Sequence, residues 1–234
     1  MRLTTRHLAL VSVLAAVYAL GSFLPGFPMI GVPGSRIDVV RSLEPAYGLI
    51  LGPILGSLTA FLGAMIGKMM TGGSAVPFTP LALLSAFVAA SLGRRTIFRI
   101  KGWIVAASVL ALLIAAWYVT PAGSIFLYYP FMHLIGVAII LLFRGRIANY
   151  AESRNKAKLS LGVLLCSFPA TMAGHMLGNL IFYYLYNPSP FFFISILPIT
   201  VFERITLTVL STLIATPLIV LVRSVFPELV RDLA

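Results

Sequence analysis

Long runs of apolar residues follow one another along almost the whole chain, and they restrict the fold more than any other feature of the sequence. Only 10% of the residues are charged, against about a quarter in an ordinary soluble protein, and the mean hydropathy is +1.03. Inside a bilayer the backbone must satisfy its own hydrogen bonds, so only helices and closed barrels cross it. The segments lack the strict apolar–polar alternation of a membrane β-barrel. We therefore expect an all-α, polytopic membrane bundle, with residues 1–234 as a single integral membrane domain.

The basic residues predict how this bundle is oriented, because Lys and Arg accumulate in the cytoplasmic loops of membrane proteins. Thirteen of the 17 lie near the two chain ends or in the links 94–101 and 144–158, whereas the links 73–77, 119–123 and 187–197 carry no charge. Eight crossings with both termini in the cytoplasm place every basic cluster inside. The net charge of +11 then reports orientation in a cell membrane and not nucleic-acid binding. The expected segments are 7–24, 37–51, 53–72, 78–93, 103–118, 124–143, 160–186 and 198–222.

The region 44–70 has two possible interpretations. It could form one continuous helix, which at 1.5 Å per residue would be about 40 Å long. It could also form a hairpin broken at Gly52-Pro53, because proline removes a backbone donor and clashes with the preceding turn. We favour the hairpin, with its first arm starting near Ile37, since a single crossing would move the basic 94–101 link to the outside.

The first apolar segment has the basic start and small residues of a signal peptide, but its removal would spoil the predicted topology, so we expect a retained helix. Two pairs of small residues lie four apart in it, Ser12 with Ala16 and Ala15 with Ala19. Such spacing forms a flat strip on which another helix packs closely. The alternative is the ordinary abundance of alanine in membrane helices. The single cysteine, Cys166, excludes an internal disulfide and a multi-cysteine metal site.

The remaining charges are predicted to meet on the outer side of the membrane. Charges within a span are costly and usually face the protein interior or a cavity. We therefore expect an outward-facing pocket, in which Arg41 pairs with Asp38 or Glu44 along a helical turn. An ion-pair network of purely structural role is the alternative. The charged residues outside the cytoplasmic clusters are Arg36, Asp38, Arg41, Glu44, Lys68, Glu203 and Arg204.

His175 and Asn179 add a polar stripe to this pocket, because residues at i and i+4 share one face of a helix. The stripe suits a small polar organic molecule, and we expect no metal, since His133 belongs to a distant helix. An interhelical hydrogen bond is the alternative role of His175. Glu203 and Arg204 are adjacent and diverge by about 100° on a helix, so each is expected to need a separate partner, with Lys68 or an arginine as the candidates for Glu203.

Two stretches, "RIDVVRSLEPAYGLILGPILGSLTAFLGAMIGKMM" followed by "VPFTPLALLSAFVAASLGRR", together with the C-terminal "GHMLGNLIFYYLYNPSPFFF", resemble the substrate-binding S component of energy-coupling factor (ECF) vitamin transporters. The shared features are a Pro/Gly-rich loop after the first helix, a hairpin around Gly-Pro and a Pro-containing fourth helix with a basic end. The likeness covers roughly 1–95 and 160–222. The segments 103–118 and 124–143 are an extra pair beyond the family's six helices.

The resemblance implies a protein that captures a vitamin or similar small molecule from outside. Its partners would be a membrane T component and paired cytoplasmic ATPase subunits. Ala15 and Ala19 would correspond to the small residues that contact the T component, and the loop around Arg36 and Asp38 would close over the substrate. The expected substrate-binding residues are Arg36, Asp38, Arg41, Glu44, Lys68, His175, Asn179 and Glu203.

No nucleotide-binding or hydrolase motif occurs in the sequence, so we expect no cofactor and no enzymatic activity, with ATP hydrolysis left to a partner. A secondary transporter is one alternative, in which Lys68 and Glu203 could form a proton site, although no internal repeat is evident. A membrane enzyme acting on lipid headgroups is another, with Glu203, His175 and Asp38 as its catalytic set.

Overall fold

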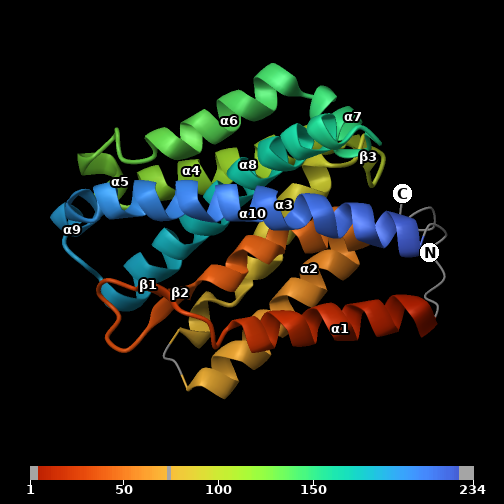
Figure 1. The fold of residues 1–234 in the computed structure, drawn as a ribbon. Helices are drawn as coiled ribbons and strands as arrows, with labels where there is room; N and C mark the ends of the chain where they lie inside the picture. Colours follow the sequence, from red (N-terminus) through yellow and green to blue (C-terminus); the bar gives the residue numbers. More distant parts are fainter. Residues whose placement is uncertain (1–4, 73–74, 227–234) are drawn as a thin grey trace.

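A computed structural model describes residues 5–72 and 75–226, and these form a bundle of helices with two small β-hairpins (Figure 1). The long helices are α1 (Thr5–Gly21), α2 (Glu44–Thr71), α3 (Pro80–Leu92), α4 (Gly102–Val119), α6 (Phe131–Phe143), α8 (Lys156–Tyr186) and α10 (Leu197–Val225). Short helices are η1 (Val39–Leu43), η2 (Val76–Phe78), α5 (Pro121–Ile125), α7 (Arg146–Ala151) and α9 (Pro190–Ser195). The strands are β1 (Gly26–Pro28), β2 (Arg36–Asp38), β3 (Thr96–Ile97) and β4 (Ile100–Lys101).

Four helical stretches are long and apolar enough to cross a membrane: 39–71, α4, α8 and α10. Three shorter apolar helices, α1, 76–92 and α6, accompany them. The chain is thus a helical membrane protein, as its hydropathy predicts. The expected segment 124–143 is interrupted, because α5 ends at Ile125 and α6 begins only at Phe131, after Pro130.

The break at Gly52-Pro53 is present. Gly52 adopts φ 85° and ψ −178°, a conformation that glycine tolerates far better than residues with a Cβ, and it divides 39–71 into two helical arms. The second arm returns along the first, since Gly56 lies directly against the backbone of Tyr47 and Gly48. Tyr18 of α1 contacts both arms, at Glu44 and at Gly63. The first arm starts at Val39, directly after β2 and close to the expected start near Ile37.

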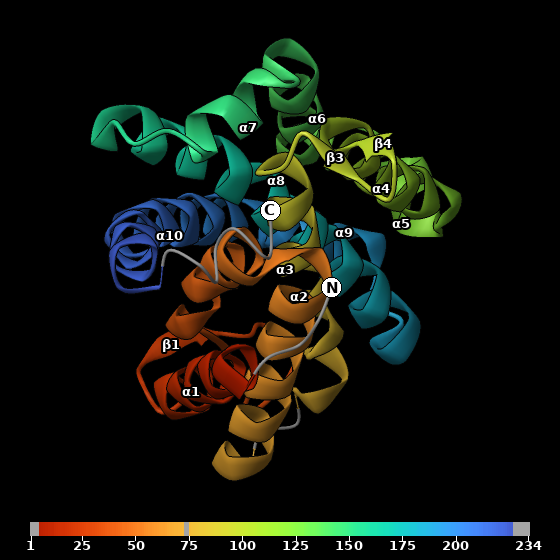
Figure 2. The same ribbon diagram turned by 90° about the vertical axis from the view of Figure 1, so that its right-hand side faces the viewer.

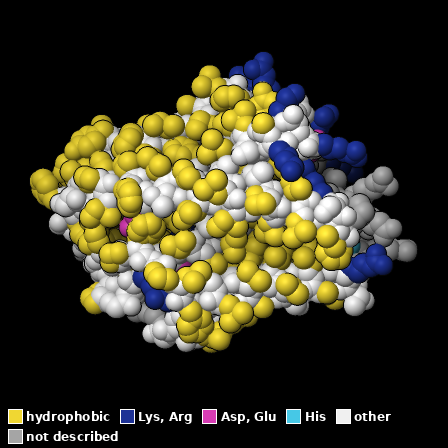
Figure 3. Space-filling model, viewed as in Figure 1, with side chains coloured by type: hydrophobic (Ala, Val, Ile, Leu, Met, Phe, Trp, Pro, Cys, Tyr) yellow, Lys and Arg dark blue, Asp and Glu magenta, His cyan; other side chains and the backbone are white. Residues whose placement is uncertain are grey.

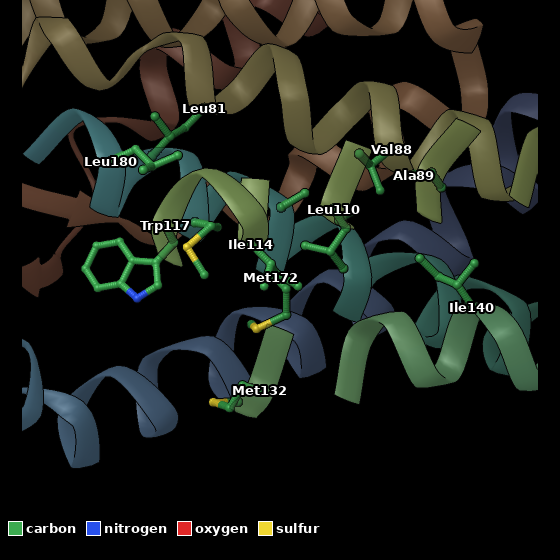
Figure 4. Close-up of a cluster of buried hydrophobic side chains, with 14 of the residues drawn as sticks. Leu81, Val88, Ala89, Leu110, Ile114, Trp117, Met132, Ile140, Met172 and Leu180 are labelled. Atoms are coloured by element: carbon green, nitrogen blue, oxygen red, sulfur yellow. The ribbon is translucent and has the colours of Figure 1, made fainter. Parts of the chain in front are cut away.

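The helices α3 and α8 lie in the middle of the bundle (Figure 2). The pair α1 and α2 packs on one side of them, and α4 with α6 packs on the other. The residues that join α4 and α6 to α3 and α8 are mostly apolar, with Leu110, Trp117 and Met172 among the most deeply buried (Figure 4). The expected extra pair is therefore an integral part of the core.

The surface divides into an apolar body and a basic end (Figure 3). Lys and Arg side chains gather where α7, the β3–β4 hairpin and the start of α1 lie, whereas hydrophobic side chains are spread over the rest of this face. At the opposite end lie the β1–β2 hairpin, α5 and α9 (Figure 1). Arg2 and Arg231, which belong to the predicted basic clusters, fall outside the described residues.

Candidate functional site

A cavity opens at the end of the molecule remote from the basic clusters, beneath the β1–β2 hairpin and between α1, α2, α8 and α10. The volume of the cavity is about 110 Å³. The structure brings all eight predicted substrate-binding residues into its lining, although they come from four separate parts of the chain. These residues are Arg36, Asp38, Arg41, Glu44, Lys68, His175, Asn179 and Glu203.

The loop after α1 forms a lid of two antiparallel strands over this cavity. Phe27 pairs with Ile37 and Pro28 with Arg36, so the strands hold Arg36 and Asp38 at the cavity wall. The turn between them rests on α8 and α9, because a Cβ placed on Gly31 would lie 2.7 Å from the Phe182 ring. We call residues 26–38 the lid.

Asp38 links the lid to the second arm of α2. Its carboxylate, only 2% exposed, lies 2.7 Å from Lys68 Nζ and 3.5 Å from Arg36 Nε. Lys68 also donates to the carbonyl of Arg36 at 3.0 Å, and Arg36 donates to the carbonyl of Ser22 at 2.6 Å. Asp38 is thus paired with Lys68 and Arg36. It does not pair with Arg41, the partner predicted from helical spacing, because Asp38 lies on a strand and not on a helix.

A second group of charges lies where η1 meets α2. Arg41 Nε lies 3.0 Å from Glu44 Oε1, which confirms the predicted pairing of these residues, three positions apart. The same oxygen accepts a 2.9 Å hydrogen bond from the Tyr18 hydroxyl. The guanidinium of Arg41 extends to α8, where a Cβ on Gly174 would lie 3.6 Å from one of its nitrogens. Arg41 therefore connects η1 and α8 in the lining of the cavity.

The expectation that Glu203 and Arg204 have separate partners is wrong. Arg204 Nη2 donates to Glu203 Oε2 at 3.3 Å, and both side chains are buried. The angle of 100° between neighbours describes the Cβ directions, whereas the long arginine side chain can fold back to the preceding residue. Lys68, the lysine candidate for Glu203, is occupied by Asp38.

The separation expected between the two central histidines is also wrong. His133 Nε2 and His175 Nδ1 lie 3.1 Å apart, with their rings stacked at 5.1 Å. The two residues are 42 positions apart in sequence, and the packing of α6 against α8 brings them together. Within the part of the chain that the structure describes, no group of three or more His, Cys, Asp or Glu could hold a metal ion.

Aromatic side chains form the apolar wall of the cavity. Phe182 stacks on Phe192 at 5.2 Å, and Phe193 packs edge-on against Trp117 at 4.8 Å. Because Trp117 belongs to α4, and His133 belongs to α6, the extra helix pair supports this wall from behind.

Ala15 and Ala19 do not lie on an outer face of α1. They are 7% and 4% exposed and pack against the second arm of α2, where Gly63 and Gly67 approach them. The small residues therefore allow two helices of this chain to approach closely, which leaves neither available to a partner. The other small pair, Ser12 and Ala16, is the exposed one.

Sequence reasoning did not include Arg204 among the site residues, although it lines the cavity and is 3% exposed. The sequence did contain a signal for it, because Arg204 is a basic residue outside the predicted cytoplasmic clusters. Tyr18 and the lid residues Met29 and Ile30 were missed as well, since nothing in their local sequence marks them as neighbours of the charges.

Comparison with protein-family models finds no match, and no solved structure matches. The chain is 30% identical over 216 residues to "Uncharacterized protein MJ0923" of Methanocaldococcus jannaschii. The aligned region covers 88% of this chain and 69% of that relative.

Proposed function

The chain belongs to the family of the Methanocaldococcus jannaschii protein MJ0923, and from its cavity we propose that it is the substrate-binding subunit of an ECF-type importer. In this role it captures a vitamin or similar small molecule from outside the cell. The proposal rests on the buried, charged cavity beneath the lid.

The burial of these charges favours ligand binding over a purely structural role. Exposed ion pairs contribute only about 0–1 kcal/mol, and buried pairs often do no better than apolar residues of the same size. Hydrogen bonds from charged groups to a bound molecule are worth more, about 1.5–3 kcal/mol each. A ligand therefore supplies a reason for seven charged side chains around one cavity in a helical membrane protein.

For the topology we propose eight crossings with both termini in the cytoplasm. The two arms of 39–71 count separately, and α1, 76–92, α4, α6, α8 and α10 supply the others. With this count the basic end faces the cytoplasm and the lid faces outward, as capture from outside requires.

The partners in this proposal are a membrane T component and paired cytoplasmic ATPase subunits. Because Ala15 and Ala19 are buried, the docking strip on α1 moves to the exposed pair Ser12 and Ala16. Small residues in this place let a partner helix approach closely.

Two measurements test the proposal. The purified full-length protein in nanodiscs is screened against vitamins by thermal shift and mass spectrometry, and a binder is expected. Cells that express the chain with and without a T component and its ATPases are then compared for uptake of that binder. Uptake that needs all three partners supports the importer, whereas uptake by the chain alone contradicts it.

Single substitutions connect binding to the cavity. Arg36→Ala and His175→Ala should each weaken binding of the identified molecule about tenfold or more, because each removes a polar group from the lining. Arg144→Ala, which removes an exposed arginine at the basic end, should leave the affinity unchanged. Calorimetry of the three variants measures this, and wild-type affinity in both cavity variants would place the ligand elsewhere.

A proton-coupled secondary transporter is the second candidate, and the buried Asp38–Lys68 pair is the observation that favours it. A group that gains or loses a proton on ligand binding would couple uptake to a pH gradient. Proteoliposomes that contain this chain alone would then accumulate the ligand when a pH gradient is applied. The importer predicts no accumulation in that experiment.

A further inference from the structure

The charges around the cavity do not balance. Its lining contains four basic side chains, Arg36, Arg41, Lys68 and Arg204, and three carboxylates, Asp38, Glu44 and Glu203. The ion pairs join Asp38 to two of the cations and give the other carboxylates one each. The lining as a whole therefore carries one positive charge more than its carboxylates neutralise, and this surplus lies with Arg36, whose side chain is 38% exposed, and Lys68, which share Asp38.

Two buried donors on the cavity wall also lack an acceptor. Arg204 is 3% exposed, and its Nε has no hydrogen-bond partner, while its Nη2 makes a single 3.3 Å bond to Glu203. Asn179 is 7% exposed, and its Nδ2 has no partner within hydrogen-bonding geometry. Buried donors in proteins are nearly always satisfied, so the position of Arg204 Nε indicates an acceptor that belongs to a ligand. Asn179 lies beside it on the cavity lining, with the Tyr129 hydroxyl as its neighbour within the protein.

The other residues of the lining indicate the chemical character of the rest of that ligand. Phe78, Phe182, Phe192 and Phe193 line the same cavity, with Phe182 and Phe192 stacked. Aromatic walls with a few placed polar groups are typical of sites for small organic molecules with an apolar body.

We propose that the substrate is a small organic acid, with one carboxylate bound by Arg204 and Asn179 and an apolar or aromatic body held between the phenylalanines. This inference rests on the proposed function and adds the substrate class. A single carboxylate neutralises the surplus charge, whereas a phosphate dianion would reverse it. A guanidinium is also suited to a carboxylate, because its donors match the two oxygens.

Matched acids and amides provide the test. The purified wild-type protein in nanodiscs is titrated with benzoate and benzamide, nicotinate and nicotinamide, and indole-3-acetate and indole-3-acetamide. Each pair has nearly the same shape and differs in charge. At least one acid is expected to bind about tenfold or more tightly than its amide, since a charged hydrogen bond is exchanged for a neutral one.

Variants locate the effect. Arg204→Gln should bring the ratio of acid to amide affinity close to one, and Asn179→Leu should reduce it. Arg144→Gln removes the same charge from an exposed position and should leave the ratio at its wild-type value. If Arg204→Gln does not fold, as judged by gel filtration and melting, Asn179→Leu and the wild-type ratio decide the matter.

Three results would overturn the inference: equal or tighter binding of the amides, no binding of any acid at millimolar concentration, or an unchanged ratio in both cavity variants. These results are separate from a failure of the proposed function. Tight binding of an amide would discard the acid while leaving small-molecule capture intact. Selective binding of an acid without partner-dependent uptake would discard the importer and keep the substrate class.

Discussion

Asp38 and Lys68 connect two parts of the chain that are 30 positions apart, and neither side chain is well exposed to water. A buried ion pair is a weak source of stability, because the desolvation of both charges offsets their attraction. Removing only one partner is costly, since the other charge is then left buried without compensation. The loss of either Asp38 or Lys68 is therefore expected to weaken the attachment of the lid to α2.

Lys68→Met should lower the stability of the protein by about 3–5 kcal/mol, or somewhat less because Arg36 remains near Asp38. Adding Asp38→Asn to that variant should restore much of the loss, because the amide carries no charge. Thermal melting in the same nanodiscs measures both changes. A double variant that is no more stable than Lys68→Met would show that the pair does not act as a unit.

The lid contributes residues to the cavity lining, and its two turn glycines have different surroundings. Gly31 and Gly34 have φ angles of 87° and 73°, so a Cβ at either position strains the backbone. Only Gly31 meets other residues, with Phe182 and Phe192 within 3.0 Å of an added Cβ, whereas nothing lies within 4 Å at Gly34.

Gly31→Ala should speed ligand dissociation several-fold, because the added methyl group pushes the lid away from the two rings. Gly34→Ala carries the same kind of backbone strain without the contact and should change the rate less. Stopped-flow or surface plasmon resonance on the full-length protein gives both dissociation rates. Equal rates in the two variants would mean that the contact with α8 and α9 does not hold the lid closed.

The hairpin in 39–71 matters to the site as much as the lid does. It turns at Gly52 near the basic end, so that the start of the first arm and the end of the second both reach the cavity. Glu44 comes from one arm and Lys68 from the other. A straight helix would place these residues about 36 Å apart.

On the scale of the bundle, the two faces of α1 have different tasks. Ala15→Trp should destabilise the protein by about 1–3 kcal/mol or more, because it overfills the interface with α2. Ala16→Trp, on the exposed face, should leave melting and ligand affinity unchanged and abolish partner-dependent uptake. Uptake at the wild-type level in Ala16→Trp would remove this face from the proposed docking site.

The proposed topology is tested by labelling introduced cysteines in whole cells. Cys166 is buried, so Cys166→Ala provides a suitable background. A membrane-impermeant maleimide should reach Ser124→Cys and Ser189→Cys from outside, and Gly145→Cys only after the cells are permeabilised. Labelling of position 145 in intact cells would contradict the eight crossings.

Hydropathy and single backbone breakers were sufficient to predict the helical membrane class and the break in 39–71, because both depend on local properties of the chain. The same local information also selected most of the charged residues of the cavity, although not Arg204. A charge in an apolar segment is costly wherever the segment packs, so its presence alone marks an interior position. For this reason all eight predicted residues line one cavity.

The partners of those residues depended on contacts between distant segments. Helical spacing predicted that Arg41 could pair with Asp38. The chain at Asp38 forms a strand, however, and Lys68 pairs with it instead. His133 and His175 meet because α6 packs on α8, and Ala15 is buried because α2 covers it. A side chain's type limits whether it is buried, whereas the docking of whole helices decides what it touches.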